Sequence, residues 1–478
     1  MYDIFIGLEI HVQLKTQSKI FCNCRAAYGD EPNTNICPVC MGHPGVLPAL
    51  NEHAMELAYL TASALNCELA QVCSFDRKNY FYPDLPKNYQ ISQFARPLGT
   101  NGHITFLCNG EEKTVRIKQC HLEEDAGKMI HAGDMSLLDF NRTGTPLLEI
   151  VTEPDVKSGE EAEALLHHLR SIVRYLSVCD GNMDEGSMRC DANISINDVG
   201  KGLGNKVEVK NLNSSRFVRK AIGYEYERQQ ALLNEGQTIV VETRLWNENR
   251  DVTETMRRKE AADDYRYFPE PDLPPFFAEE SFLARVQERM VELPMQRRAR
   301  FISEYGISPT HAEVLTEEKS SADFFEAAVS HGADPGKLVA WYISDVKKQL
   351  NKLGIDIAES YLQPEWLADM LQRIDRSEIS GKIAKKVLEL VFAGEGSPEQ
   401  IIEAKGLQQI SDPAQLAPVI DEVLHANTVA AREIADGQSK PIGFVVGQVM
   451  QKTNGKADPA ILQQLIRERV AAGDWSEA

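Results

Sequence analysis

The chain has 478 residues, of which 43% are hydrophobic, and a formal net charge of -20 at pH 7. This length exceeds a single hydrophobic core, so we expect roughly two to four domains. The negative charge excludes a protein that coats nucleic acid through a general positive field, although a local basic groove remains compatible with it. Residues 4–12 carry Glu9 and His11, and the sequence has no run of about 20 apolar residues, so we expect a soluble, cytoplasmic protein without a signal peptide.

Short segments rich in Val, Ile, Phe and Tyr, broken by Gly, Pro and Asn, continue to about residue 290. This pattern predicts an α+β fold whose first domain, residues 1–293, is rich in β-strands. Within it we expect helices from near Ala49, over residues 158–177 and over residues 214–234.

Longer helical periodicities with charged faces follow Leu293. They predict a helical bundle domain over residues 294–405 and a small all-α tail domain over residues 406–478. The last helix has the clearest start, because Asp458 can cap it and Pro459 suits its first turn.

Four of the ten cysteines form a C-x-C pair and a C-x-x-C pair separated by 12 residues. They are Cys22, Cys24, Cys37 and Cys40. Two close pairs on turns favour a tetrahedral zinc site, and four thiolates leave no open position for catalysis, so this zinc would be structural. Four buried thiols without a metal are the alternative. A zinc-deaminase signature is excluded, because Glu9 precedes His11 and Pro38 follows its cysteine.

The strand expected over residues 4–12 has an aliphatic residue at every even position, so Glu9 and His11 share its other face. A solvated outer face would explain this pattern in one strand. Later segments repeat it, with charged residues along one face or at the end of a strand. These residues are the acids at 123–125, Glu149, Arg189, Asp191, Lys206, Glu208 and Lys210. We therefore expect several strands to share one polar face.

Acids with one histidine and no thiol suit Mg²⁺, whereas the interleaved Lys and Arg suit phosphate oxygens. This combination indicates phosphoryl transfer, which depends mainly on aligning groups and neutralising charge. The sequence has no G-x-x-x-x-G-K-[ST] loop, so the expected ATP site is of a different design.

Long motifs occur along almost the whole chain. They are Gly-Leu-Glu-Ile-His-Val-Gln-Leu at residues 7–14, the cysteine cluster, and residues 81–93, 138–155, 188–193, 209–215 and 447–459. Together they resemble the signatures of the B subunits of aspartyl/glutamyl-tRNA(Asn/Gln) amidotransferases, the GatB/GatE family. The resemblance implies a cradle domain with the kinase site and a zinc knuckle, a helical domain, and a tail of the YqeY type that binds tRNA.

The resemblance also implies the activity, a glutamine-hydrolysing ligase reaction carried out by a heterotrimer. The B subunit uses ATP to phosphorylate the side-chain carboxylate of Glu-tRNA(Gln) or Asp-tRNA(Asn). Ammonia from a partner amidase, the A subunit, then forms the amide, and a small C subunit supports the pair. A noncatalytic, zinc-containing scaffold that docks tRNA is the alternative, but such a surface would not collect acids that repel phosphate.

The site residues implied by the resemblance fall into two groups. A permanent Mg²⁺ would be held by His11, Glu124 and Glu149, and a second, ATP-associated Mg²⁺ by Glu9 and Asp191. Beyond what the resemblance implies, we add basic residues beside the motifs as candidate contacts for phosphate or the tRNA acceptor end; they are Lys78, Arg142, Lys206 and Lys210. In the tail, the basic residues either meet the tRNA elbow or are ordinary solvated charges; they are Lys452, Lys456, Arg467 and Arg469.

Overall fold

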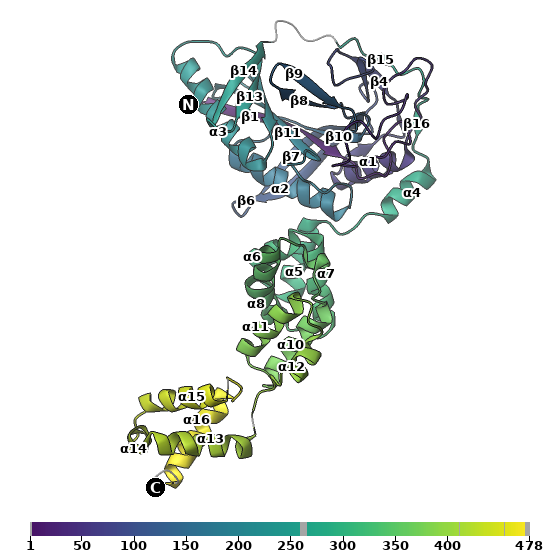
Figure 1. Ribbon diagram of the computed structural model, residues 1–478. Coiled ribbons are helices and arrows are strands. Elements are labelled where there is room, and N and C mark those ends of the chain that lie inside the picture. Colours follow the sequence, from purple (N-terminus) through teal and green to yellow (C-terminus); the bar gives the residue numbers. More distant parts are fainter. Residues whose placement is uncertain (1, 259–264, 411, 454, 474–478) are drawn as a thin grey trace. The chain divides into compact units, whose positions relative to one another are not determined.

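The computed structural model describes residues 2–258, 265–410, 412–453 and 455–473. The chain forms two compact units, Met1–Gln296 and Arg297–Ala478. The first unit contains the sheet and the second unit is helical (Figure 1). This arrangement confirms the expected α+β fold.

A 12-stranded mixed sheet forms the centre of the first unit. In spatial order its main path is β14 (Val252–Arg258), β13 (Glu242–Asn247), β12 (Lys206–Leu212), β11 (Met188–Asp198), β1 (Tyr2–Gln13), β10 (Pro146–Thr152), β7 (Glu111–Glu124), β5 (Tyr89–Ser92), β4 (Asp76–Asn79) and β15 (Phe268–Pro269). Off this path, β6 (Gly99–Cys108) pairs with β7 and β2 (Glu68–Leu69) pairs with β6. The pair β12 and β13 is parallel, and the helix between these strands provides the crossover that a parallel pair needs.

Two further sheets have two strands each. They are β16 (Phe276–Phe277) with β3 (Val72–Cys73), and β8 (Lys128–Ala132) with β9 (Met135–Asp139). The helices of this unit are α1 (Glu52–Ala64), α2 (Gly159–Tyr175), α3 (Ser215–Asn234) and α4 (Glu280–Glu288). Ser158 and Ser214 cap α2 and α3, because each side chain accepts a backbone N–H of the first turn.

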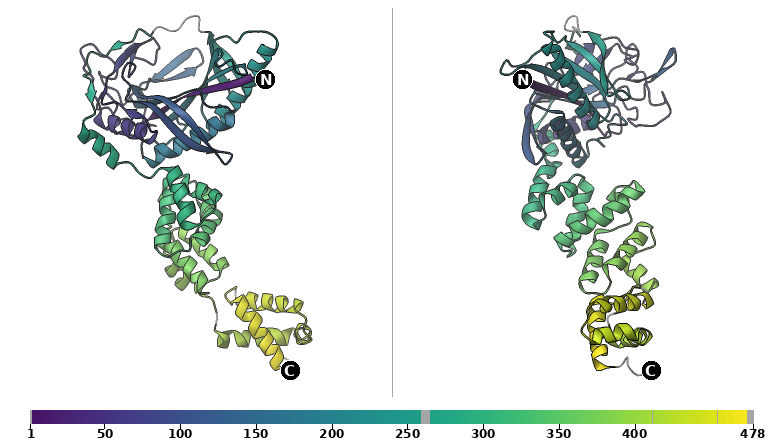
Figure 2. Two further views of the ribbon diagram at one scale, coloured as in Figure 1. Left: turned by 180° about the vertical axis from the view of Figure 1, so that it is seen from behind. Right: turned by 90° about the vertical axis from the view of Figure 1, so that its left-hand side faces the viewer.

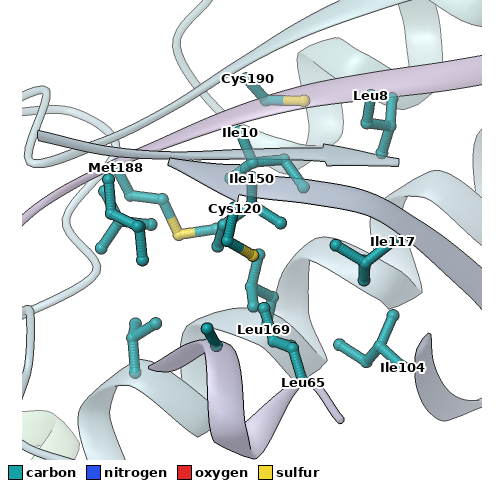
Figure 3. Close-up of a cluster of buried hydrophobic side chains, with 14 of the residues drawn as sticks. Leu8, Ile10, Leu65, Ile104, Ile117, Cys120, Ile150, Leu169, Met188 and Cys190 are labelled. Atoms are coloured by element: carbon teal, nitrogen blue, oxygen red, sulfur yellow. The ribbon is translucent and has the colours of Figure 1, made fainter. Parts of the chain in front are cut away.

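Alternation along β1 separates the two faces of the sheet. Ile6, Leu8, Ile10 and Val12 are buried in one hydrophobic core with residues of α1, α2 and α3. Figure 3 shows part of this core, where side chains of β1, β7 and β10 meet Leu65 and Leu169. Glu9 and His11 therefore lie on the opposite face, as the sequence predicted.

The second unit consists of short helices (Figure 2). They are α5 (Pro294–Tyr305), which begins in the first unit, α6 (Pro309–Thr316), α7 (Lys319–Ser330), α8 (Pro335–Trp341), η1 (Tyr342–Val346), α9 (Lys347–Leu353), η2 (Ile357–Glu359), α10 (Pro364–Asp375), α11 (Gly381–Phe392), α12 (Pro398–Ala404), α13 (Pro413–Ala426), α14 (Thr428–Ala435), α15 (Lys440–Lys452) and α16 (Pro459–Ala472). One core extends from Phe301 to Ile402 and a separate one from Leu416 to Val470.

The last helix starts as its sequence predicted. The Asp458 carboxylate accepts hydrogen bonds from the backbone N–H groups of Ala460 and Ile461, and Pro459 occupies the first turn. Gly473, with φ of 77°, ends the helix in the left-handed conformation that glycine adopts at little cost. Among the described residues, no helix combines the length and apolar character that a membrane span requires.

Candidate active site

An imidazole and two carboxylates meet on the polar face of the sheet. His11 on β1 pairs with Glu149 on β10, which pairs with His121 on β7. Glu149 Oε2 lies 3.5 Å from His11 Nε2 and 3.3 Å from His121 Nε2, and Glu123 Oε1 lies 3.8 Å from His11 Nε2. The ligand atoms of His11, Glu123 and Glu149 all lie within 4.8 Å of one another. We call these three residues the acid cluster; its ligand set suits a divalent cation.

The structure does not bring Glu124, which the resemblance implied as a ligand, together with His11 and Glu149. Glu124 is buried on the opposite face of the sheet. Its carboxylate pairs with the Lys87 ammonium and accepts a hydrogen bond of 2.9 Å from the backbone N–H of Ile91. Both Lys87 and Glu124 line a cavity of about 240 Å³ next to the cysteine cluster.

A β-bulge in β7 determines which glutamate faces the acid cluster. The pairing with β10 skips Lys118. Odd-numbered side chains such as Ile117 belong to the hydrophobic core before the bulge, whereas even-numbered ones such as Cys120 belong to it after the bulge. Because a bulge inserts one residue, it reverses the alternation of the following side chains. Glu124 therefore points into the protein interior and Glu123 points to the polar face.

The two carboxylates of the acid cluster differ in pKa. Burial opposes ionisation of Glu149, but His121 and His11 outweigh burial and hold its pKa well below the usual value. Burial and the charge of Glu149 raise the pKa of Glu123. The carboxylates therefore repel each other across a short distance, and a divalent cation between them would remove this repulsion.

A second group of acids lies beside the acid cluster on the same face. Glu9, two residues before His11 on β1, pairs with Asp191 on β11, and the ligand atoms of Glu9, Asp191 and Glu208 lie within 4.8 Å of one another. Lys210 Nζ lies 2.6 Å from Asp191 Oδ2 and 3.1 Å from Glu208 Oε1. Glu208 was not among the predicted ligands, although the alternation of β12 places it on this face.

The structure places Lys78 close to the acidic residues of the polar face, whereas Lys206 lies away from them. Burial lowers the pKa of Lys78, but the charges of Glu123, Tyr267 and Glu149 outweigh burial and raise it. Lys206 is exposed at the start of β12, opposite Ser195. Since each strand residue advances about 3.4 Å, Lys206 lies far from the row of Asp191.

Arg142 holds a turn rather than pointing freely into the site. Its guanidinium donates to the carbonyls of Ala126 and Gly127 at 2.9 and 2.7 Å, and its Nε lies 3.7 Å from Asp125 Oδ2. Arg189, whose strand residue pairs with His11, donates to the same carboxylate oxygen at 2.7 Å. Although burial opposes ionisation, Arg189 and Arg142 hold the pKa of Asp125 below its usual value.

The four predicted zinc ligands come together on turns between β1 and α1. The ligand atoms of Cys22, Cys24, Cys37 and Cys40 lie within 4.8 Å of one another, so the group could hold a metal ion. The backbone N–H of Cys37 donates to Cys40 Sγ at 3.2 Å. Hydrogen bonding from the Cys22 thiol lowers the pKa of Cys40 to about 4, and the charge of Lys19 contributes.

Lys19 provides an independent indication that this cluster carries negative charge. Its side chain is fully buried, and its Nζ lies 3.6 Å from Cys40 Sγ and 3.2 Å from the carbonyl oxygen of Phe140. No carboxylate pairs with this ammonium in the part of the chain that the structure describes. A buried cation needs a counter-charge, and thiolates on a metal would provide it.

The loop between the two cysteine pairs is tied to the turn that carries Arg142. Asn33 donates from its backbone to Asp139 Oδ1 at 3.1 Å, and its side-chain oxygen accepts from the backbone of Phe140 at 2.8 Å. Asn35 N–H donates to Asn141 Oδ1 at 2.8 Å. The position of the turn at residues 138–144 therefore depends on the cysteine loop.

Two of the four basic residues named in the tail form ion pairs within it. Lys452 pairs with Glu422, and Arg469 Nη2 lies 3.0 Å from Asp421 Oδ2. Arg467 is exposed.

Comparisons with known proteins agree over nearly the full length. The family model for the GatB/GatE catalytic domain matches residues 4–284, and the GatB domain model matches residues 323–470. The B subunit of the aspartyl/glutamyl-tRNA(Asn/Gln) amidotransferase from Carboxydothermus hydrogenoformans is 47% identical over 476 residues, covering 98% of this chain and 99% of the relative. The proteins of the same name from Thermodesulfovibrio yellowstonii and Persephonella marina are 48% and 47% identical, covering 97% and 98% of this chain and 98% and 99% of those relatives. The chain belongs to the GatB/GatE family.

Proposed function

We propose that this chain is the B subunit of a heterotrimeric ligase that converts Glu-tRNA(Gln) to Gln-tRNA(Gln) and Asp-tRNA(Asn) to Asn-tRNA(Asn). The chain uses ATP to phosphorylate the side-chain carboxylate of the misacylated amino acid. The observation that carries the proposal is the convergence of His11, Glu123 and Glu149 on one face of the sheet. The names of the relatives support the assignment of the substrate class.

The reaction needs activation because a carboxylate is a poor electrophile. A carboxylate oxygen attacks the γ-phosphorus of ATP, the bond to the bridging oxygen breaks, and ADP leaves. Ammonia then attacks the carbonyl carbon of the acyl phosphate, and inorganic phosphate leaves with the C–O bond electrons. Bound Mg²⁺ supplies charge neutralisation at the phosphoryl oxygens.

The residues of the polar face have distinct roles in this step. His11, Glu123 and Glu149 hold one Mg²⁺, with Glu123 in the place first expected for Glu124. Glu9, Asp191 and Glu208 hold the second, ATP-associated Mg²⁺. These sets fit hard cations because they offer carboxylate oxygens and one imidazole.

Two lysines complete the site. Lys210 contacts Asp191 and Glu208, so it is placed to keep two carboxylates in position and to contact a phosphate oxygen. Lys78 supplies a second positive charge near Glu123. Arg142 acts indirectly, because its Nε and Nη2 donate to the turn that it holds, and Lys206 is left without a role in phosphoryl transfer.

The cysteine cluster holds a structural zinc. Four sulfur ligands match the composition of structural zinc sites, in which no coordination position is left for substrate. Lys19 would balance part of the negative charge of a four-thiolate zinc complex. Through Asn33 and Asn35, the zinc loop then supports the turn with Arg142.

The remaining parts of the reaction are assigned to partners and to the helical unit. An amidase A subunit supplies ammonia and a small C subunit supports the pair, because the reaction takes its nitrogen from glutamine. We assign catalysis to residues 1–293 and tRNA binding to the tail at residues 406–478. The helical domain at residues 294–405 connects the two and has a structural role. Since the substrate is aminoacyl-tRNA, the place of action is the cytoplasm.

The test uses the full chain in complex with its A and C partners. ATP hydrolysis that depends on misacylated tRNA is measured for wild type, Glu123→Gln and the control Glu112→Gln, which changes an exposed glutamate on the same strand. We expect Glu123→Gln to lower the rate of tRNA-dependent ATP hydrolysis about 100-fold or more. A metal at the phosphoryl group contributes several kcal/mol to stabilising the transition state. Glu112→Gln should match wild type.

Equal turnover by wild type and Glu123→Gln would remove the acid cluster from the reaction. A scaffold without catalytic function is the other reading of such a result. The buried acids count against it, because uncompensated carboxylates repel the phosphates that a docking surface must bind.

A further inference from the structure

A continuous series of aromatic rings borders the acid cluster. The rings of Phe94 and Tyr267 are stacked, with centroids 4.1 Å apart and an interplanar angle of 11°. Tyr267 contacts Tyr265, Tyr265 contacts Tyr80, and Tyr80 contacts Tyr82, each with centroids 6.1 Å apart. We call these five residues the aromatic run; they come from the segments after β4 and β5 and the segment before β15.

Much of the aromatic run is open to solvent at its ends. Phe94 is 60% exposed and Tyr82 is 43% exposed, and the neighbouring Phe81 is 68% exposed. Grouped exposed aromatic side chains are unusual on a protein surface unless they bind something. Arg266 lies with its guanidinium carbon 5.9 Å from the centroid of Phe81, so the exposed rings have a cation beside them.

Lys78 connects the aromatic run to the acid cluster. Its Nζ lies 5.1 Å from the ring centroid of Tyr265 and 5.8 Å from that of Tyr80. Lys78 on β4 pairs with Gln90 on β5, and Ser92 on β5, two residues before Phe94, pairs with Glu123 of the acid cluster. A ligand lying along the rings would therefore have one end near the carboxylates of the acid cluster, which would hold the metal.

The backbone at Phe94 is fixed in position. The buried Asp76 carboxylate accepts hydrogen bonds of 3.0 Å from the N–H groups of both Phe94 and Ala95. The preceding residue, Gln93, donates from its backbone to the carbonyl of Leu122 on β7 at 3.1 Å. A ring held in place before binding loses little conformational entropy when a ligand arrives.

Exposed aromatic faces next to cations are the means by which proteins bind unpaired nucleobases. Sites for small ligands enclose most of the ligand, whereas Phe94 and Phe81 lie open on the surface. A series of rings also offers more stacking area than a single adenine uses. In a chain with a net charge of -20, Lys78 and Arg266 place two cations beside these rings, where they can contact phosphate oxygens of a strand.

We propose that the aromatic run binds the unpaired 3′-terminal nucleotides of aminoacyl-tRNA, with Phe94 as a stacking ring, and so places the esterified amino acid at the acid cluster. This inference rests on the proposed function, because it identifies how the same site holds its substrate. Phe94 is a binding residue in this account and takes no part in bond making.

The experiment measures tRNA binding by the full complex without ATP, so turnover is not required. The probes are intact tRNA(Gln) and the same tRNA without its three 3′-terminal nucleotides. We expect Phe94→Ala to raise the Kd for intact tRNA roughly 5- to 100-fold, the range for loss of one stacked base. The Kd for the shortened tRNA should not change, and Phe94→Trp should bind intact tRNA like wild type.

Phe277→Ala is the matched control, because Phe277 is 62% exposed and belongs to a different, two-stranded sheet. It should bind both tRNAs like wild type. Equal effects of Phe94→Ala on both tRNAs, or no effect on either, would overturn the proposal. A raised Kd for Mg-ATP with unchanged tRNA binding would also overturn it and assign the ring to ATP. Failure of the proposed function would instead appear as undiminished turnover in Glu123→Gln.

Discussion

The acid cluster and the cysteine cluster both offer metal ligands, but the chain holds them in different ways. The acid cluster lies on β1, β10 and β7, whose backbone pairing sets His11 opposite Glu149. The cysteine cluster lies on turns, with Cys22 and Cys40 separated by a loop without helices or long strands. A sheet can position ligands before the ion binds, whereas a loop with few apolar anchors depends on the ion for its shape.

The largest expected effect is therefore the removal of metal from the cysteine cluster. Structural zinc sites contribute binding free energies on the order of 10 kcal/mol to folding. After treatment with a strong chelator, we expect hydrogen exchange to accelerate at the N–H groups of Met41, Gly42 and His43, which bond within this turn. Amides of β1 should keep their protection, since the sheet ladder does not depend on the ion.

Unchanged protection of Met41 to His43 after complete zinc removal would show that the loop is as preorganised as the sheet. The measured zinc content before and after chelation serves as the control. Loss of protection in β1 as well would show that the two regions are one folding unit.

The next effect concerns Asp125, which lies between the two regions. It pairs with Arg189 beside the acid cluster and with Arg142 on the turn that contacts the cysteine loop. Asp125→Asn should lower the free energy of unfolding by about 3 kcal/mol, because it leaves partly buried arginines without their counter-charge. Denaturant unfolding measures this loss.

Asp155→Asn provides the comparison, because Asp155 pairs with the largely exposed Arg116. Exposed pairs contribute about 1 kcal/mol or less. If both substitutions lower the free energy of unfolding by the same amount, Asp125 does not link the two regions.

A smaller effect is expected at Lys19, which contacts Cys40 without being a ligand. Lys19→Met keeps the length of the side chain but removes its charge. Loss of a residue that supports metal ligands typically lowers affinity about 10- to 100-fold, and competition with a chromogenic chelator measures it. The exposed Lys15 offers a control, because Lys15→Met should leave zinc affinity unchanged.

The smallest effect is a pH dependence outside both clusters. Burial lowers the pKa of His168 on α2 from 6.5 to about 4. Between these pH values the unfolded chain binds more protons than the folded one, so stability falls as pH drops from about 6.5 toward 4. Because His168 is only partly buried, we expect the free energy of unfolding to fall by about 1 to 2 kcal/mol over this pH range. Calorimetry of His168→Gln should show a flatter pH profile; an unchanged slope would contradict the assignment.

Much of the fold could be predicted from the sequence because local patterns determine it. The alternation at residues 4–12 gave the buried and polar faces of β1 correctly, and Ser158, Ser214 and Asp458 marked the starts of helices. The spacing of the cysteines was enough to bring four thiols together. In each case the signal lies within about twenty residues.

The site could be predicted only in part, because its ligands come from different strands. The bulge at Lys118 reverses the alternation of β7, and nothing in the sequence alone marks its position. The resemblance implied Glu124 as a ligand, whereas the structure places Glu123 with His11 and Glu149. Glu208 joins Asp191 only through the pairing of β11 with β12. Similarly, the distance of Lys206 from the acids follows from strand register, which a single sequence does not reveal.

Binding of Mn²⁺ tests the central claim most directly, because Mn²⁺ shares the preference of Mg²⁺ for oxygen ligands and is observed by electron paramagnetic resonance. The full complex is titrated as wild type, Glu123→Gln and Glu124→Gln, which change neighbouring residues on opposite faces of β7. We predict that Glu123→Gln loses one Mn²⁺ site and that Glu124→Gln keeps it. Loss of the site in Glu124→Gln with retention in Glu123→Gln would contradict the account.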